Sequence, residues 1–393
     1  MVVKLFLIID GIPGNNKKRS KIMSTVLVTG GAGFIGSHTV DRLISLGYNV
    51  KILDNLQKPV HLKGKPNYLN PKAEFIFGDV RDKKTLEYAL ENVDYIYHFA
   101  AYQDYLPDFS TFFHVNSVST ALLYEIIYEK KLNIKKIIVA SSQFVQGEGL
   151  YKKKNGEVVK PELRTIEQLE KGEWDWKDEN GETMQWQWTP ESHANPPNAY
   201  AISKFSQEQI AIKFGKRYQI PSVALRYSIV QGPRQSFYNA YSGANRIFNL
   251  HYYFDKAPTI YEDGKQLRDF VNIHDVVDAN ILVLEKEEAN YQVFCVGGGK
   301  PYSISEFANI VAKVHGKEYI KPKIPGEFRV GDTRHTLSDN SKLRKLGWLP
   351  KRTPEDSVKE YLEYLNQQTD IDDILDYAEK TMKQMNVVRK IKK

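Results

Sequence analysis

The chain has 393 residues, of which 41% are hydrophobic, so it is long enough to form two lobes with buried cores. Its single cysteine, Cys295, excludes an internal disulfide and a cysteine-based metal cluster, and we expect a reducing, cytoplasmic setting and no bound metal. The net charge of +7 is concentrated in residues 1–22 and 380–393, and no run of 18 apolar residues is present, so neither nucleic-acid binding nor a membrane span is predicted.

The first informative element is a glycine-rich turn that follows an apolar run at residues 26–29. Gly30, Gly33 and Gly36 are spaced three apart, and the pattern then becomes helical. Such glycines allow a tight turn, a close approach of the backbone to a pyrophosphate, and close packing of the helix on the sheet. The turn therefore predicts a dinucleotide site, with an ordinary flexible turn as the alternative.

A second apolar run, residues 50–53, ends at Asp54, eighteen residues after Gly36. An acid at this strand tip accepts hydrogen bonds from the adenosine ribose hydroxyls and repels a 2′-phosphate, which favours NAD over NADP. The competing interpretation is that Asp54 and Asn55 only form a turn.

Further apolar runs alternate with helical patterns along the chain, at residues 75–77, 95–99, 137–139 and 223–225. This alternation is typical of an α/β protein with a Rossmann-type, doubly wound parallel sheet. Ligands bind such sheets at the carboxyl ends of the strands. The residues that follow these runs, and are therefore expected near the site, are Asp79, Ala100, Ala101, Ser141, Ser142, Arg226 and Tyr227.

The pattern divides the chain into four parts. Residues 1–22 form an N-terminal extension, and residues 23–226 an NAD-binding domain with a β-rich insertion at about 148–189. Residues 227–365 form a smaller α/β substrate lobe that partly returns to the first domain near 270–290. Residues 366–393 are expected to form a C-terminal helix and a solvated basic tail.

The insertion contains the pairs Asn155–Gly156 and Asn180–Gly181, which predict tight hairpins. We expect its tryptophans to pack a small satellite core, with a partner surface as the alternative. They are Trp174, Trp176, Trp186 and Trp188.

Tyr200 and Lys204 lie four residues apart and share one face of a helix that begins near Asn198. An ammonium beside a phenol favours the phenolate, so we expect Lys204 to lower the pKa of Tyr200 toward the range of a general base.

Together with the glycine turn and the Ser141–Ser142 pair, these residues make the chain from about 23 to 365 resemble the extended short-chain dehydrogenase/reductase family. Its members are mostly nucleotide-sugar epimerases and dehydratases, and the resemblance implies a homodimer. It implies that Ser142, Tyr200 and Lys204 are catalytic. The implied NAD contacts are Gly30, Gly33, Phe34, Ile35, Gly36, Asp54, Asn55, Asp79, Val80, Phe99, Ala100, Ala101, Asn116, Tyr200, Lys204 and Tyr227. The implied contacts with a nucleotide-diphosphate sugar are Tyr102, Ser142, Arg234, Arg268, Arg329 and Arg334.

Within that family, Ser142 is followed by Gln143 and Phe144, where sugar 4,6-dehydratases carry the acidic Thr-Asp-Glu triplet. The lack of a carboxylate here favours NAD-dependent 4-epimerisation, by transient oxidation at C4, rotation of the 4-keto sugar and re-reduction. The insertion that begins at Gly147 resembles that of dTDP-L-rhamnose 4-epimerases, although it lacks their cysteines. A dehydratase or oxidoreductase of the same family, and an NAD-binding scaffold without turnover, stay open as alternatives.

Overall fold

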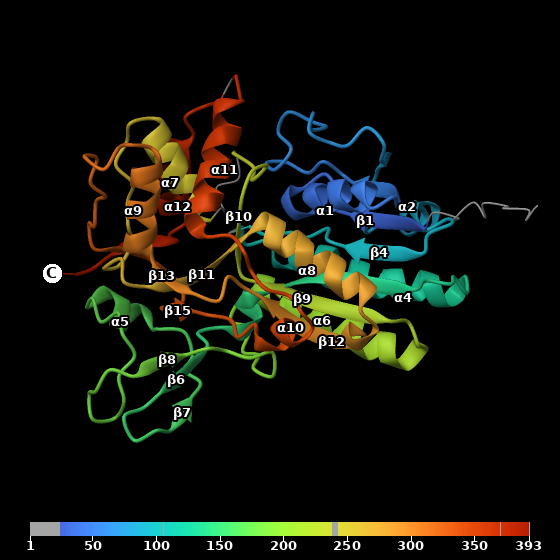
Figure 1. Cartoon of the computed structure of the whole chain (residues 1–393). Coiled ribbons are helices and arrows are strands. Elements are labelled where there is room, and N and C mark those ends of the chain that lie inside the picture. The colour runs from blue at the N-terminus through green and yellow to red at the C-terminus, as the bar shows by residue number, and fades with distance from the viewer. Residues whose placement is uncertain (1–23, 105, 238–242, 370, 393) are drawn as a thin grey trace, which may run out of the picture.

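The computed structural model describes residues 24–104, 106–237, 243–369 and 371–392, so the predicted extension 1–22 lies outside the described residues. The largest element is a seven-stranded sheet in the order β12-β9-β5-β4-β1-β2-β3, with every neighbouring pair parallel (Figure 1). The strand order reverses between β1 and β4, which confirms the predicted doubly wound Rossmann-type fold. The strands are β1 (Thr25–Thr29), β2 (Asn49–Asp54), β3 (Glu74–Phe77), β4 (Tyr95–His98), β5 (Lys136–Ser142), β9 (Ser222–Tyr227) and β12 (Gln292–Val296).

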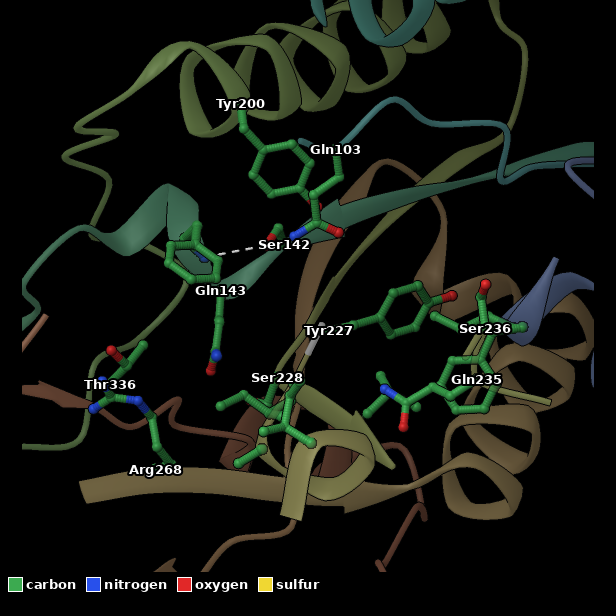
Figure 2. A pocket seen from close by; sticks show the side chains of 18 of the residues that line it. Gln103, Ser142, Gln143, Tyr200, Tyr227, Ser228, Gln235, Ser236, Arg268 and Thr336 are labelled. Atoms are coloured by element: carbon green, nitrogen blue, oxygen red, sulfur yellow. Dashed lines mark hydrogen bonds between the residues drawn. The ribbon is translucent and has the colours of Figure 1, made fainter. Parts of the chain in front are cut away.

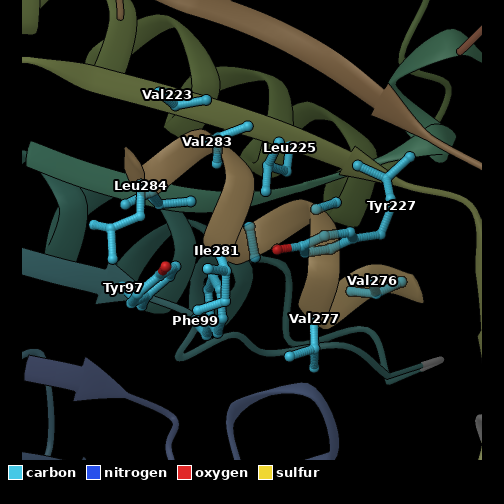
Figure 3. Packing of buried hydrophobic residues seen from close by; sticks show 14 of the residues in the cluster. Tyr97, Phe99, Val223, Leu225, Tyr227, Val276, Val277, Ile281, Val283 and Leu284 are labelled. Carbon is cyan, nitrogen blue, oxygen red and sulfur yellow. The ribbon is translucent and has the colours of Figure 1, made fainter. Parts of the chain in front are cut away.

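Helices cover both faces of this sheet because its strands are apolar on both sides. On one face, α1 and α8 bury Leu43 and Val276 against the strands, and Figure 3 shows α8 residues packed on those of β4 and β9. On the other face, α2 and α4 bury Leu86 and Leu123. With both faces packed, a ligand reaches the sheet at the strand ends. The helices are α1 (Phe34–Ser45), α2 (Lys83–Ala89), α3 (Phe109–Phe112), the π-helix η1 (Phe113–Val118), α4 (Ser119–Glu129), α6 (Ala199–Tyr218) and α8 (Ile273–Glu285).

A second, smaller lobe follows β9. Its sheet contains β10, β11 and β13, with β15 paired to β11, and its core includes Phe248, Phe270 and Phe307. The chain returns from this lobe to the large sheet through α8 and β12. The elements of this part are β10 (Ile229–Gln231), α7 (Ala244–Tyr253), β11 (Leu267–Asn272), η3 (Glu287–Ala289), β13 (Pro301–Ser303), α9 (Ile304–Val314), β15 (His335–Thr336), α10 (Ser341–Lys345) and α11 (Pro354–Asn366).

The insertion after β5 forms a three-stranded sheet in the order β7-β6-β8. Both predicted Asn-Gly turns are present, with Gly156 and Gly181 at positive φ angles of 92° and 80°. All four tryptophans are half-buried, the rings of Trp186 and Trp188 contact each other at a centroid distance of 5.8 Å, and Trp174 packs on Phe328 outside the insertion at 6.1 Å. The insertion is also held by buried ion pairs such as Arg164–Glu262. Its elements are η2 (Gln143–Gln146), β6 (Leu150–Lys152), β7 (Val158–Val159), α5 (Ile166–Glu170) and β8 (Gln185–Gln187).

The C-terminal segment is docked on the protein through its backbone and is not a free tail, while the side chains of Arg389, Lys390 and Lys392 are exposed to solvent as expected. Helix α12 (Leu375–Gln384) is followed by β16 (Val388–Lys390), which pairs antiparallel with β14 (Glu327–Arg329). The backbone N–H of Lys392 then donates to the carbonyl oxygen of Glu170 at 2.8 Å. These backbone bonds tie the basic end of the chain to the substrate lobe and to the insertion. Among the described residues, no helix combines the length and apolar character that crossing a bilayer requires.

Candidate active site

The glycine turn lies between β1 and α1, and its backbone is packed most closely at Gly30 and Gly36. A Cβ atom on Gly30 would lie 2.7 Å from the amide nitrogen of Ala100, and one on Gly36 would lie 2.2 Å from the carbonyl oxygen of Gly30. The first turn of α1 holds no acidic residue, and no side chain caps its N-terminus. The positive end of the helix dipole is therefore available to an anion such as a pyrophosphate.

A cavity of about 170 Å³ extends from this turn past the ends of β2 and β3. Asp54 lies at its edge, with its carboxylate oxygens accepting the N–H groups of Ala32 at 3.0 Å and Leu56 at 2.8 Å. Asn55 donates to Asp79 at 2.9 Å, and a hydrogen bond from Arg81 is the main cause that lowers the pKa of Asp79 to about 2. The expected NAD contacts that line this cavity are Gly30, Gly33, Asp54, Asn55, Asp79, Val80, Phe99, Ala100 and Ala101.

A larger cavity of about 530 Å³ begins at the same turn and runs between the two lobes. The expected residues that line it are Gly30, Gly33, Phe34, Ile35, Gly36, Phe99, Ala101, Ser142, Tyr200, Lys204, Tyr227, Arg268 and Arg329. The structure thus brings the three proposed catalytic residues and two of the four arginines to one cavity, and Figure 2 shows Ser142, Tyr200 and Arg268 around it.

Ser142 is the last residue of β5 and Tyr200 lies in the first turn of α6, and Figure 2 shows the two side chains near each other. Asn198 caps α6 by accepting the N–H of Ala201 at 2.9 Å, which confirms the predicted helix start. The Tyr200 ring makes edge contacts with Phe112 and Phe144, at centroid distances of 6.5 Å and 6.3 Å. Aromatic packing from two sides fixes the direction in which the phenol points.

The expected effect of Lys204 on Tyr200 is wrong for this structure. Burial raises the pKa of Tyr200 to about 12, although the neighbouring Ser142 hydroxyl acts in the opposite direction. The Lys204 ammonium nitrogen donates instead to the carbonyl oxygen of Ala140 and to Oε1 of Gln207, both at 2.8 Å. Burial lowers the pKa of Lys204 to about 7. Burial therefore affects the pKa values of both groups more than the short spacing between them in the sequence does.

Asn116 lies behind the cavities, and Tyr102 lines only the smaller of the two. Asn116 is fully buried behind the cavities, where its amide donates to Ser203 at 2.9 Å and its Oδ1 accepts the N–H of Tyr102 at 2.9 Å. It holds the loop after β4 against α6 beside Lys204. Tyr102 lines the smaller cavity and donates its hydroxyl to Asp108 at 2.7 Å.

Arg268 and Arg329 lie along the larger cavity on the side of the substrate lobe. The guanidinium of Arg268 is held by three carbonyl oxygens, those of Leu267, Thr333 and Arg334, at 2.9–3.1 Å. Arg329 pairs with Asp332 at 2.7 Å and stacks over the Tyr261 ring at 5.3 Å. Guanidinium groups at such a wall suit the oxygens of a diphosphate.

The other two arginines do not line either cavity, because carboxylates elsewhere hold them. Arg234 pairs with Asp41 at 2.8 Å. The Arg334 guanidinium is buried among Asp175, Glu262 and Asp263, at distances of 2.7–3.1 Å. Arg334 contributes to the site only through its carbonyl oxygen, which accepts from Arg268.

The structure adds cavity residues that sequence reasoning missed. Leu375, Glu379 and Met382 of α12 line the larger cavity, so the C-terminal helix forms part of its wall. The amphipathic pattern of this segment predicted a helix but did not indicate where the helix would dock. Gln143 and Gln266 also line this cavity, and the side-chain carbonyl oxygen of each has no hydrogen-bond partner.

These observations fit NAD as the cofactor. The turn leaves no room for a side chain at Gly30 or Gly36, and the uncapped end of α1 suits a pyrophosphate. The Asp54 carboxylate lies at the strand tip, where it can accept hydrogen bonds from a ribose.

The model of the NAD dependent epimerase/dehydratase family matches residues 26–169 and 176–297. The chain is 34% identical to a dTDP-L-rhamnose 4-epimerase of Burkholderia thailandensis, over 88% of this chain and 96% of that protein. Among solved structures, it is similar to the UDP-glucose 4-epimerase of Thermotoga maritima with UDP-glucose, with 30% identity, a TM-score of 0.71, and coverage of 87% and 99% of the two chains. It is also similar to the UDP-glucuronic acid 4-epimerase of Bacillus cereus in complex with NAD, with 26% identity, a TM-score of 0.68 and the same coverage.

Proposed function

Because this chain belongs to the NAD-dependent epimerase/dehydratase family, we propose that it inverts C4 of a nucleotide sugar, with NAD as a cofactor that is not consumed. The observation that carries this proposal is the larger cavity. It joins the glycine turn at one side, Ser142, Tyr200 and Lys204 at another, and Arg268 and Arg329 on the substrate lobe.

The chemistry needs few protein groups. NAD, when bound, supplies the centre that accepts the C4 hydrogen as a hydride and later returns it. Tyr200 removes the proton of the C4 hydroxyl and gives it back after the sugar has turned over. Ser142 hydrogen-bonds the same sugar oxygen, and its hydroxyl beside Tyr200 lowers the pKa of the phenol against the larger effect of burial. Lys204 is assigned to the ribose next to the nicotinamide, since its side chain lines the same cavity.

We assign the sugar diphosphate to the arginine side of the cavity. The three carbonyl oxygens that hold Arg268 orient its guanidinium before any substrate arrives, and this lowers the entropy cost of binding an anion. The similar proteins named above act on dTDP- and UDP-linked sugars, and we propose that the substrate of this chain belongs to one of these two groups.

The decisive experiment is incubation of the protein and NAD with UDP-galactose, UDP-glucose, UDP-glucuronic acid and dTDP-L-rhamnose, followed by chromatography of the sugars. A C4 epimer without net NADH is the expected result. A keto or deoxy product would favour a dehydratase, net NADH would favour an oxidoreductase, and NAD binding without any turnover would favour a sensing scaffold.

We also propose a homodimer that forms through α4 and α6. Tyr128 and Tyr218 are 63% and 44% exposed on these adjacent helices, with ring centroids 4.9 Å apart. An exposed aromatic pair on two packed helices suits a two-fold helical interface. Light scattering should give twice the chain mass for the wild type and a lower mass for Tyr128→Glu.

For the compartment we propose the cytoplasm, because the single cysteine, Cys295, is buried and unpaired. Cell fractionation tests this proposal, and recovery from an oxidising compartment would contradict it.

A further inference from the structure

Gln143 is the first residue after β5 and follows Ser142 directly. Its side chain is 2% exposed and lines the larger cavity. In Figure 2 it extends away from Tyr200 toward the level of Ser228 and Thr336. The carboxamide therefore lies between the proposed reacting groups and the wall that contains Arg268.

The Oε1 atom of Gln143 is buried and has no hydrogen-bond partner. The hydroxyls along this part of the wall are paired, since Ser228 donates to Asp269 at 2.8 Å and Thr333 and Thr336 bond to each other, whereas the side-chain oxygens of Gln235 and Gln266 in the same cavity also have no partner. A buried amide oxygen without a donor is costly, and native proteins rarely keep one without a functional reason or a bound water. This oxygen is thus an acceptor that a ligand can use.

The position of the Gln143 oxygen determines which part of a bound nucleotide sugar can donate a hydrogen bond to it. The reacting carbon lies at Ser142 and Tyr200, and the diphosphate is assigned to Arg268, so the sugar ring lies between them beside Gln143. A neutral amide accepts a hydrogen bond from a hydroxyl there, whereas a carboxylate would add negative charge close to the diphosphate.

We propose that Gln143 is a specificity-determining residue that accepts a hydrogen bond from a hydroxyl of the sugar ring. This inference rests on the proposed function. It assigns Gln143 to the sugar and not to the nucleotide, so its effect on binding should depend on whether the sugar is present.

The test compares Gln143→Met, which removes the amide and keeps the length of the side chain, with the wild type. Calorimetry measures the Kd for UDP-glucose and dTDP-L-rhamnose, each beside its nucleoside diphosphate, in the NAD-loaded protein. We expect about a tenfold weaker Kd for the nucleotide sugar and an unchanged Kd for the nucleoside diphosphate. Gln266→Met is the matched control, because Gln266 has the same unpartnered oxygen in the same cavity but donates to Tyr261 at 3.0 Å, beside Arg329.

An equal change in both Kd values, no change in either, or the same sugar-dependent loss in Gln266→Met would overturn the assignment of Gln143. Thermal melting shows whether the variant is folded, and a second variant, Gln143→Leu, replaces it if it is not. If the wild type binds neither nucleotide sugar, the proposed function itself fails, and this outcome is distinct from a failure of the Gln143 assignment alone.

Discussion

Arg164 and Glu262 lie 98 residues apart in the sequence and form a bidentate ion pair with both N–O distances at 2.8 Å. Their side chains are 0% and 2% exposed, and Arg334 joins the same carboxylate at 3.1 Å. The pair connects the insertion to the substrate lobe. It also lies behind the segment whose carbonyl oxygens hold Arg268, so the insertion supports the proposed diphosphate site.

Replacing Glu262 with Gln should destabilise the protein by about 3 kcal/mol, because two buried guanidinium groups then lose a shared negative partner. Denaturant unfolding measures this change. Glu167→Gln is the control, since Glu167 pairs with Lys171 on an exposed helix surface, where water screens the charges and the free energy of unfolding should hardly change. Equal unfolding midpoints for the two variants would show that the buried pair has no special role.

Replacing Tyr200 with Phe should lower kcat by about 10²–10⁴-fold, the usual contribution of a general base. The amount of NAD bound should stay the same, because the ring and its packing on Phe112 and Phe144 are kept. Tyr88→Phe, on the exposed surface of α2, is the matched control. Similar kcat values for the two variants would remove Tyr200 from the mechanism.

Two glycine variants should distinguish the role of the turn in packing, measured by Tm, from its role in NAD binding. Gly36→Ala places a Cβ atom 2.2 Å from the carbonyl oxygen of Gly30, so both Tm and NAD binding should fall. Gly33→Ala meets only one atom, at 3.3 Å, but Gly33 lines both cavities, so NAD binding should fall with little change in Tm. Thermal melting and NAD titration measure both effects, and unchanged NAD affinity in Gly33→Ala would contradict this division.

The pH dependence of stability should contain a contribution from Asp269. Burial raises the pKa of this carboxyl from 3.8 to about 6, although Ser228 and Gly299 donate hydrogen bonds to it. The folded protein then binds more protons than the unfolded chain between these values, so the stabilisation is present below about pH 4 and is lost as the pH rises through about 6. Relative to Asp269→Asn, the free energy of unfolding should fall by on the order of 3 kcal/mol across this range. Parallel pH curves for the two proteins would contradict the assignment.

Changes in the cavity wall formed by α12 should weaken binding of the substrate and leave binding of the cofactor unchanged. Met382 is buried and lines the larger cavity together with Leu375 and Glu379. Met382→Ala should raise KM for the nucleotide sugar severalfold with little change in NAD affinity, because the glycine turn lies on another element. Met385→Ala, on a half-buried residue just after the helix, is the control. A matching rise in KM for both variants would indicate a general loosening of the C-terminal segment.

Sequence reasoning predicted the parts of the site that local pattern controls. The apolar runs became strands of the large sheet, the glycine turn lies between β1 and α1, and the spacing of Tyr200 and Lys204 put both on α6 beside one cavity. It could not predict that the Arg334 side chain is held by carboxylates away from the cavity. One of these partners is Asp175, which lies 159 residues earlier in the sequence and 2.8 Å from the Arg334 guanidinium.

The sequence by itself determined the Rossmann-type framework and the identity of the proposed reacting groups, because strand and helix periodicity and tight turns depend on neighbouring residues. Only the tertiary structure decided which arginines face the cavity, that the C-terminal segment forms one of its walls, and that the pKa of Tyr200 rises. Burial and ion pairing depend on segments that are distant in the chain. The loss of water around Tyr200 changes its pKa more than Lys204, four residues away, does.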